Sequence, residues 1–202
     1  MTIKILGIDY SLSGTGLAGI TDSKLDFYKV FTSKKQIIKD YPEHATLAYH
    51  DGTQEERIDS TCKDIIECGY DYNFVCMEEH TGVNYSWMDG YAIIKYLLRQ
   101  KGIPYITISP TSLKKYAGAG RADKDAMTRM LQEEYGYDFS ELEKSANNVV
   151  DATWLALVGK AYYRRYVLGE NTKPVKCRHE VLLRLKKNNK YFEEVYGTTA
   201  EG

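Results

Sequence analysis

The chain has 202 residues, which is enough for one domain with an appendage and for a hydrophobic core that needs no disulfides or metal staples. With 43% hydrophobic and 27% charged residues, and only 4 Pro and 16 Gly, the composition excludes a disordered or low-complexity chain. The formal net charge of −1 excludes the chain-wide basic balance of many nucleic-acid binders, and no apolar run approaches the roughly 20 residues of a membrane span.

The first part of the chain predicts three strands. Residues 3–9 form a short, β-branched apolar run of the kind found in buried strands. Residues 15–20 and 25–31 follow after short turns, which favours an antiparallel meander. Residues 33–53 are polar and predict no element.

The middle of the chain alternates between helix and strand. Apolar residues at helical spacing predict helices over residues 54–68, 86–101, 123–135 and 146–168. Short apolar runs predict buried strands over residues 73–78 and 103–108. This order predicts an α/β fold with one mixed five-stranded sheet, three antiparallel strands followed by parallel strands, and helices on both faces.

Charge is unevenly distributed along the chain. Residues 160–190 carry ten Lys or Arg against two Glu, a local charge of +8, whereas residues 1–159 carry 17 basic and 23 acidic residues, a charge of −6. We therefore expect a domain over residues 1–168 and a basic C-terminal extension over residues 169–202, helical from 178 to 187. A basic helix can be a solvated surface or a contact for nucleic acid, and the sequence leaves both interpretations open.

Three acids occupy positions that are otherwise apolar. Asp9 and Glu78 end two predicted buried strands, and Asp151 lies in the apolar start of the last long helix. If those strands are neighbours, the two strand-end carboxylates lie side by side and raise each other's pKa unless a cation intervenes. An all-oxygen set of ligands suits Mg²⁺ or Mn²⁺, and strand-end caps or ion pairs are the alternative interpretation. Asn148 projects from the same helix face as Asp151 and offers a carbonyl ligand or an amide donor.

Four stretches together resemble the RuvC family of Holliday junction resolvases, in the RNase H-like superfamily. Residues 7–18 resemble the family's first acidic strand and turn, "G-I-D-P-G" followed by "T-G", and residues 75–79 resemble its second acidic strand. Residues 109–127 are the most specific match, to "P-x-x-V-K" and "G-x-G-x-A-D-K", and residues 148–157 resemble "D-x-x-D-A". The order and spacing hold across about residues 1–165.

The chain departs from the family pattern at three places. Tyr10-Ser11 replaces the Pro-Gly after the first acid, and Asn148 stands where the family often has an acid. His80 follows the second acidic strand, where some bacterial members have an aromatic residue that stacks on junction bases. The long tail and the 18 tyrosines suggest a phage-type member.

The resemblance implies an RNase H-like fold and a magnesium-dependent endodeoxyribonuclease of the crossover-junction type. Such a homodimer resolves four-way DNA junctions by paired phosphodiester hydrolysis, giving 5′-phosphate and 3′-hydroxyl ends. The implied metal ligands, for two Mg²⁺ ions per active site or for Mn²⁺ as a substitute, are Asp9 as the bridging ligand, Glu78, Asp151 and, as a further candidate, Asn148. Lys124 matches the motif lysine and is expected to neutralise the scissile phosphate or the developing charge.

Further basic and aromatic residues are candidates for DNA binding, although exposed turns and half-buried helix positions are the alternative. These candidates are Lys114, Lys115 and Arg121 around the glycine-rich loop, Tyr85 and Trp87 after the second acidic strand, and Arg164 and Arg165 in the last long helix. We expect branched DNA and a second copy of the chain as partners, and neither a membrane nor a nucleotide cofactor.

Other functions remain open at this point. One is a nuclease of broader branched-DNA specificity, acting on forks or flaps, and another is a non-catalytic junction-binding protein; Asn148 motivates both. An ATPase shares the first motif, but its two lobes would not fit in 202 residues. The four cysteines contain no Cys-x-x-Cys pair, so we expect a reducing, cytoplasmic setting, in a bacterial host cell if the protein is phage-encoded.

Overall fold

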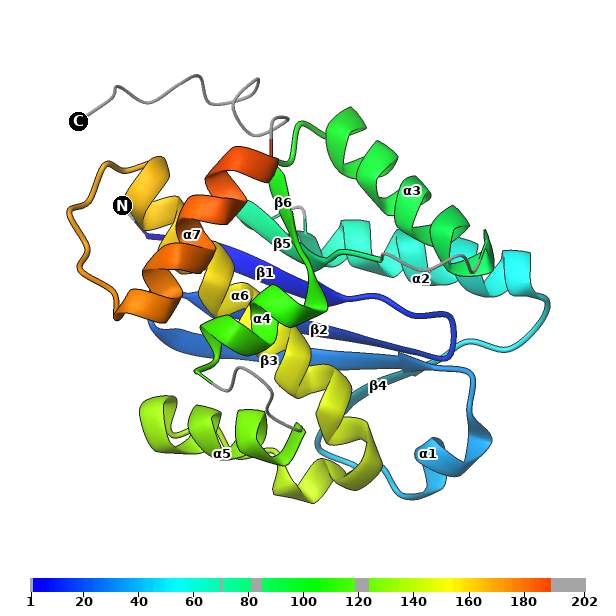
Figure 1. The fold of residues 1–202 in the computed structure, drawn as a ribbon. Coiled ribbons are helices and arrows are strands. Elements are labelled where there is room, and N and C mark those ends of the chain that lie inside the picture. Colours follow the sequence, from blue (N-terminus) through cyan, green and yellow to red (C-terminus); the bar gives the residue numbers. More distant parts are fainter. Residues whose placement is uncertain (1, 70, 81–84, 119–123, 190–202) are drawn as a thin grey trace.

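A computed structural model describes residues 2–69, 71–80, 85–118 and 124–189 of the chain (Figure 1). The strands are β1 Lys4–Asp9, β2 Gly14–Thr21, β3 Lys24–Thr32, β4 Thr46–Tyr49, β5 Phe74–Glu78 and β6 Tyr105–Ile108. The helices are α1 Lys35–Lys39, α2 Gln54–Gly69, α3 Tyr85–Gln100, α4 Pro110–Tyr116, α5 Lys124–Tyr135, α6 Ala146–Tyr166 and α7 Lys176–Asn188, with a 3₁₀ turn over Ser140–Ser145.

The strands form one mixed sheet in the order β4-β3-β2-β1-β5-β6, which confirms the predicted fold class. Strands β1, β2 and β3 are antiparallel neighbours, while β5 lies parallel to both β1 and β6. The prediction of five strands is wrong, because β4 pairs in parallel with β3 at the sheet edge. Its four residues are partly or fully exposed, so no buried apolar run reveals this strand in the sequence.

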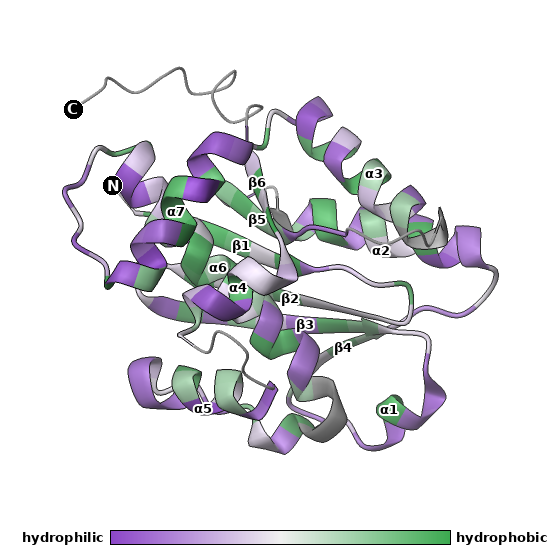
Figure 2. Ribbon diagram, in the orientation of Figure 1, coloured by the Kyte–Doolittle hydropathy of each residue, from purple (hydrophilic) through white to green (hydrophobic). Residues whose placement is uncertain are grey.

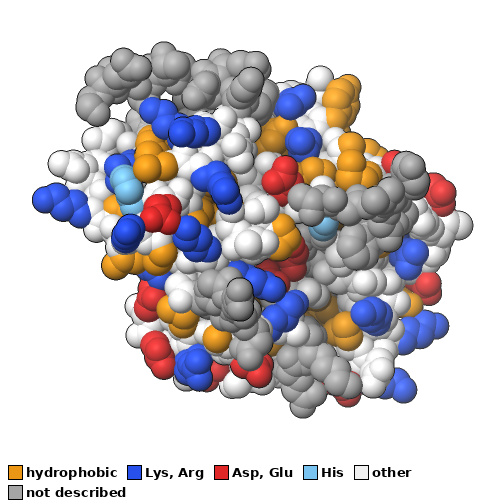
Figure 3. Space-filling view, viewed as in Figure 1, with side chains coloured by type: hydrophobic (Ala, Val, Ile, Leu, Met, Phe, Trp, Pro, Cys, Tyr) orange, Lys and Arg blue, Asp and Glu red, His pale blue; other side chains and the backbone are white. Residues whose placement is uncertain are grey.

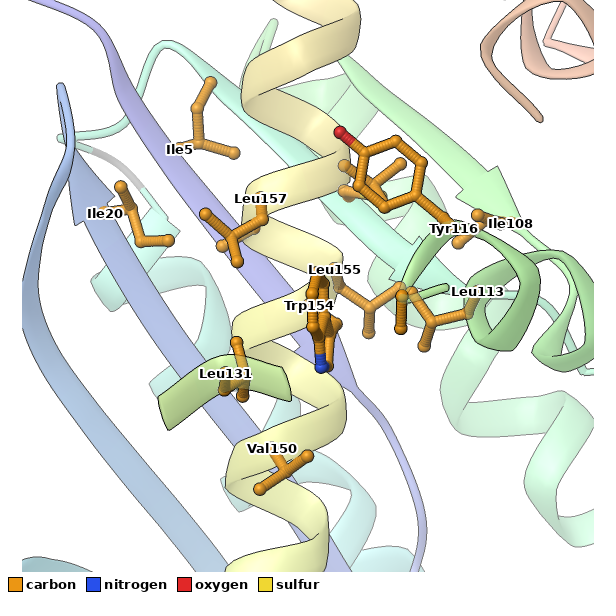
Figure 4. Packing of buried hydrophobic residues seen from close by; sticks show 14 of the residues in the cluster. Ile5, Ile20, Ile108, Leu113, Tyr116, Leu131, Val150, Trp154, Leu155 and Leu157 are labelled. Atoms are coloured by element: carbon orange, nitrogen blue, oxygen red, sulfur yellow. The ribbon is translucent and has the colours of Figure 1, made fainter. Parts of the chain in front are cut away.

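Helices cover both faces of the sheet, as predicted. Successive strand residues point to opposite faces, so Ile5 packs into the core under α6 while Leu6 and Ile8 pack against α2 and α3. Figure 4 shows the first of these cores, in which Trp154 and Leu157 of α6 lie among strand residues and residues of α4. Figure 2 shows hydrophobic residues along the central strands and alternating hydrophobic and hydrophilic bands on α7.

Helix α6 lies unusually close to strand β1. A Cβ atom added at Gly7 would stand 1.9 Å from the carbonyl oxygen of Ala152 and 2.6 Å from the backbone nitrogen of Ala156. One added at Gly159 would stand 2.8 Å from a methyl group of Ile5. Only glycine allows backbones to approach so closely, and this contact fixes the height of α6 above the sheet.

The C-terminal helix α7 is part of the same folded body. Its residues Val181, Leu182 and Leu185 are buried in the same core, where α7 contacts α4, α6 and β6. The side-chain amide of Asn189 donates to the carbonyl of Thr107 at 3.1 Å and its oxygen accepts from the Thr107 backbone N–H at 2.7 Å, so the helix end is tied to strand β6. The division into a domain of residues 1–168 and an extension of 169–202 stays a prediction. None of the helices in the described ranges is long and apolar enough to cross a membrane.

Candidate functional site

Strands β1 and β5 bring Asp9 and Glu78 together. The two strands are parallel neighbours, with Gly7 opposite Cys76 and Ile8 opposite Met77. Continuing this register by one residue places Asp9 opposite Glu78, both at the carboxyl end of their strand. Because side chains alternate along a strand, both acids point to the face that α6 covers.

Helix α6 supplies the third acid. Asp151 precedes Ala152, the residue whose carbonyl oxygen lies against Gly7, so it lies close to the end of β1, and its charge raises the pKa of Asp9. Asn148 lies against the start of β2, where a Cβ atom on Gly14 would stand 2.7 Å from its side-chain nitrogen. The close approach of α6 and β1 therefore places all three acids and Asn148 over the carboxyl edge of the central strands.

The three carboxylates affect one another electrostatically. Burial raises the pKa of Asp9 well above its ordinary value, and the charges of Asp151 and Glu78 raise it further. Burial and then the charge of Asp151 raise the pKa of Glu78 to about 7. Burial also raises the pKa of Asp151, although Lys124 and Lys114 act to lower it. The acids thus form one interacting cluster rather than three separately neutralised groups.

Two lysines lie at the edge of this cluster. The Nζ atom of Lys124 stands 3.5 Å from an Oδ atom of Asp151, whose side chain is 13% exposed against 49% for the lysine. Lys124 lowers the pKa of Asp9 and Glu78 as well, and Lys114 lowers that of Glu78. Three acids and two lysines leave a local formal charge of −1, with the lysines toward solvent.

The chemistry of this cluster fits a divalent cation. The donors are carboxylate oxygens with an amide oxygen beside them, which hard cations such as Mg²⁺ prefer. Within the described part of the chain, no three His, Cys, Asp or Glu side chains stand close enough together to hold an ion as they are. Neighbouring carboxylates repel one another, and a cation between them would offset both this repulsion and the cost of burying their charge.

The turn after Asp9 compensates for the missing Pro-Gly of the family pattern. The Ser11 hydroxyl donates to the carbonyl of Gly14 at 2.9 Å, and the Thr15 hydroxyl donates to the carbonyl of Ser11 at 2.7 Å. These side-chain hydrogen bonds close the loop between β1 and β2. The sequence Ser-Leu-Ser-Gly-Thr supplies both hydroxyl groups, of which that of Thr15 is buried.

The sequence marked Tyr10 only as a departure from the family pattern and gave it no structural role. Its side chain is 1% exposed and packs behind Asp9, where a Cβ atom on Gly90 would stand 1.7 Å from its hydroxyl oxygen. Its ring meets the ring of His80 edge to face at a centroid distance of 6.1 Å. Tyr10 and Gly90 together join the end of β1 to helix α3.

The remaining predicted DNA-binding residues are distributed over the molecule. Lys115 follows Lys114 on α4 and pairs with Glu180 of α7 at 2.6 Å. Arg164 pairs with Glu170 at 2.6 Å and Arg165 donates to the carbonyl of Thr172 at 2.9 Å, both at the end of α6 far from Asp151. The structure therefore does not bring these two arginines to the acids. Arg121 and the side chains of Tyr85 and Trp87 lie outside the described residues.

No protein-family model and no curated protein matches the sequence. Among solved structures, the fold is similar to that of Thermus thermophilus RuvC, with a TM-score of 0.59 and 18% identity over 81% of this chain and 96% of that chain. The same protein in complex with a Holliday junction substrate gives a TM-score of 0.59 and 17% identity over 81% and 95%. The yeast mitochondrial Holliday junction resolvase Ydc2 is less similar, with a TM-score of 0.48 and 11% identity over 94% and 83%.

Proposed function

We propose that this chain, which has the RuvC-type RNase H-like fold, is a metal-dependent endonuclease that resolves four-way DNA junctions by phosphodiester hydrolysis. The observation that carries the proposal is the cluster of Asp9, Glu78 and Asp151 at the carboxyl edge of the sheet, where open α/β sheets place their functional sites. The similar fold of a protein solved with a Holliday junction supports branched DNA as the substrate.

The three acids, with Asn148 beside them, are the residues that would hold Mg²⁺ or Mn²⁺. When bound, the metal would lower the pKa of a water molecule and offset the charge of the phosphate. The chain itself contributes two cations at the edge of the cluster. The positive charges of Lys124 and Lys114 are felt at the cluster, where they lower the pKa of Glu78 and Asp151. The same charges would attract the scissile phosphate and stabilise the charge that develops on it.

A homodimer fits symmetric cleavage, because a four-way junction has approximate two-fold symmetry and needs two active sites related by such an axis. Helix α3 follows Glu78 in the chain, and three large hydrophobic side chains among its described residues are exposed. They are Met88, Ile93 and Tyr96, with 43%, 41% and 60% exposure. We propose that this face of α3 pairs with a second copy, which would place the two acid clusters on one side of the dimer.

The decisive experiment is cleavage of a labelled four-way junction by the wild-type protein and by Asp9→Asn. We expect cleavage with Mg²⁺, and binding without turnover with Ca²⁺, whose larger and looser coordination misplaces the attacking water. Asp9→Asn should bind the junction but lose cleavage by at least about 100-fold, since each removed ligand charge weakens the metal site. Normal cleavage by both Asp9→Asn and Glu78→Gln would contradict the proposal.

A second candidate function is cleavage of a wider range of branched DNA. It is favoured by Asn148, which is a neutral side chain at the edge of the cluster and contributes no charge to metal binding. Comparing cleavage of junction, fork and flap substrates distinguishes this candidate from a dedicated resolvase. Tight junction binding without turnover in any divalent metal would instead identify a non-catalytic junction-binding protein.

A further inference from the structure

Helix α7 carries five basic residues and one acid, and the fold uses these charges in two different ways. Arg178 lies inside the structure: it makes two hydrogen bonds with Glu134 and stacks over the rings of Tyr116 and Trp154. Lys186 lies over the ring of Tyr166 at 5.3 Å from its centroid. Both side chains therefore pack against aromatic rings of the protein itself.

Arg184 and Lys187 are placed differently. Val181, Leu182 and Leu185 face the core, so positions 180, 184 and 187 form a stripe on the outer side of the helix. Both side chains are exposed, and neither forms an ion pair with an acid in the described ranges. The helix therefore presents Arg184 and Lys187 to the surface, in addition to Lys176 in its first turn, which is exposed as well.

This stripe continues toward the acid cluster. A groove of about 210 Å³ between α4 and α7 is lined by Ser112, Lys115, Glu180, Val181 and Arg184. Lys115 adjoins Lys114, the residue that lowers the pKa of Glu78 and Asp151. Figure 3 shows Lys and Arg side chains gathered over α4 and α7 on the face that carries acidic side chains at its centre. The cations thus lead from the cluster across α4 to the outer side of α7.

We infer that α7 is a second DNA-contacting element, in which Arg184 and Lys187 bind the phosphodiester backbone of a duplex arm that leads away from the cleavage site. The inference rests on the proposed function and specifies where the substrate lies. Successive cations on one face match the spaced charges of a DNA backbone, and such contacts position the duplex without reading its sequence. Glu180 interrupts this path, and its pairing with Lys115 keeps that lysine from the DNA.

The test measures junction affinity at several salt concentrations, with all variants built on Asp9→Asn so that the DNA stays intact. The variant Arg184→Ala/Lys187→Ala should lower the affinity at least about tenfold and reduce the slope of log K against log salt by about 2, since each phosphate contact contributes about 0.9. Glu180→Gln should act in the opposite direction and bind several-fold more tightly, because it removes a negative charge and frees Lys115. Both changes are at exposed positions, so the fold should tolerate them.

The matched control is Lys24→Ala/Lys63→Ala, which removes two exposed cations elsewhere. Lys24 lies at the opposite end of the sheet from Asp9, and Lys63 lies on α2 behind the sheet. This variant should bind like its parent. If Asp9→Asn binds junctions and the Arg184→Ala/Lys187→Ala variant built on it keeps the same affinity and salt slope, the inference about α7 is wrong, while the proposed function stands. If the parent binds no branched DNA, the proposed function fails as well.

Discussion

The burial of Glu78 beside Asp151 ties the stability of the folded chain to pH. Burial raises the pKa of Glu78 from an ordinary 4.5 to about 7 in the folded state. Below pH 4.5 the folded and unfolded chains both carry the proton, so the carboxyl costs nothing. As the pH rises from 4.5 to 7 the unfolded chain loses the proton first, and the free energy of unfolding falls.

Glu78→Gln should remove this loss. In the presence of EDTA at pH 8, we expect the variant to be more stable than the wild type by about 1–3 kcal/mol, while at pH 4 the two should be alike. Urea unfolding at the two pH values measures the difference, which includes the lower pKa of Asp9 once the charge of Glu78 is removed. If the free energy of unfolding changed with pH in the same way in both proteins, burial would not raise the pKa of Glu78.

Lys124 should set the pH at which the site becomes active. Its charge lowers the pKa of Asp9, Glu78 and Asp151, and metal binding needs these carboxylates deprotonated. Lys124→Ala should therefore shift the pH profile of Mg²⁺-dependent cleavage to higher pH. A shift of one pKa unit corresponds to a loss of about tenfold at a pH below the transition.

The matched variant for this experiment is Lys124→Arg, which keeps the positive charge and should keep the pH profile. Cleavage rates are measured between pH 6 and 9 at a fixed Mg²⁺ concentration. If Lys124→Ala lowered the cleavage rate by the same factor at every pH, the lysine would act on the phosphate alone and would not affect the pKa of the acids.

At the scale of elements, the contact between α6 and β1 positions Asp151 over Asp9. Gly7→Ala would put a Cβ atom 1.9 Å from the carbonyl oxygen of Ala152, so the helix has to move away from the sheet. We expect a loss of about 3 kcal/mol in the free energy of unfolding, at the upper end for overpacked cores, together with weaker Mg²⁺-dependent cleavage.

Gly136→Ala is the control for Gly7→Ala. No heavy atom stands within 4 Å of a Cβ atom at this position, and its φ of +71° costs an alanine only about 1 kcal/mol. Chemical unfolding of both variants compares a steric clash with backbone strain. Equal losses would show that α6 can shift without cost and that Gly7 does not determine its position.

At the scale of the whole molecule, the burial of α7 residues in the core predicts that this helix unfolds together with the sheet. Leu182 is fully buried, so Leu182→Ala should lower the free energy of unfolding by about 2–4 kcal/mol. Far-UV circular dichroism and tryptophan fluorescence should report a single transition, because Trp154 packs against Arg178 of α7. An early transition of the helix alone would mean that α7 is a separate appendage.

Much of this fold can be predicted from the sequence, because its buried central strands have short apolar sequences rich in β-branched residues. The run that ends at Asp9 and the run that ends at Glu78 identify the two central strands, and a carboxylate that ends such a run stands out. Strand β4 could not be predicted, since it lies at the sheet edge and buries too little to be apolar. Helix α4 could not be predicted either, because it has only seven residues, of which Pro110 is the first.

The sequence by itself determined the central strands, the acids at their ends and the excess of positive charge near the C-terminus. Only the tertiary structure decided which of those charges remain available. Nothing in the sequence distinguishes Arg164 and Arg178 from Arg184. In the fold, Arg164 pairs with Glu170 and Arg178 pairs with Glu134, whereas Arg184 is exposed without an ion pair in the described ranges. The reason is physical: burial and ion pairing depend on the distance between side chains in the fold. The partner can be 6 residues away, as Glu170 is from Arg164, or 44 residues away, as Glu134 is from Arg178, and a local charge pattern does not contain those distances.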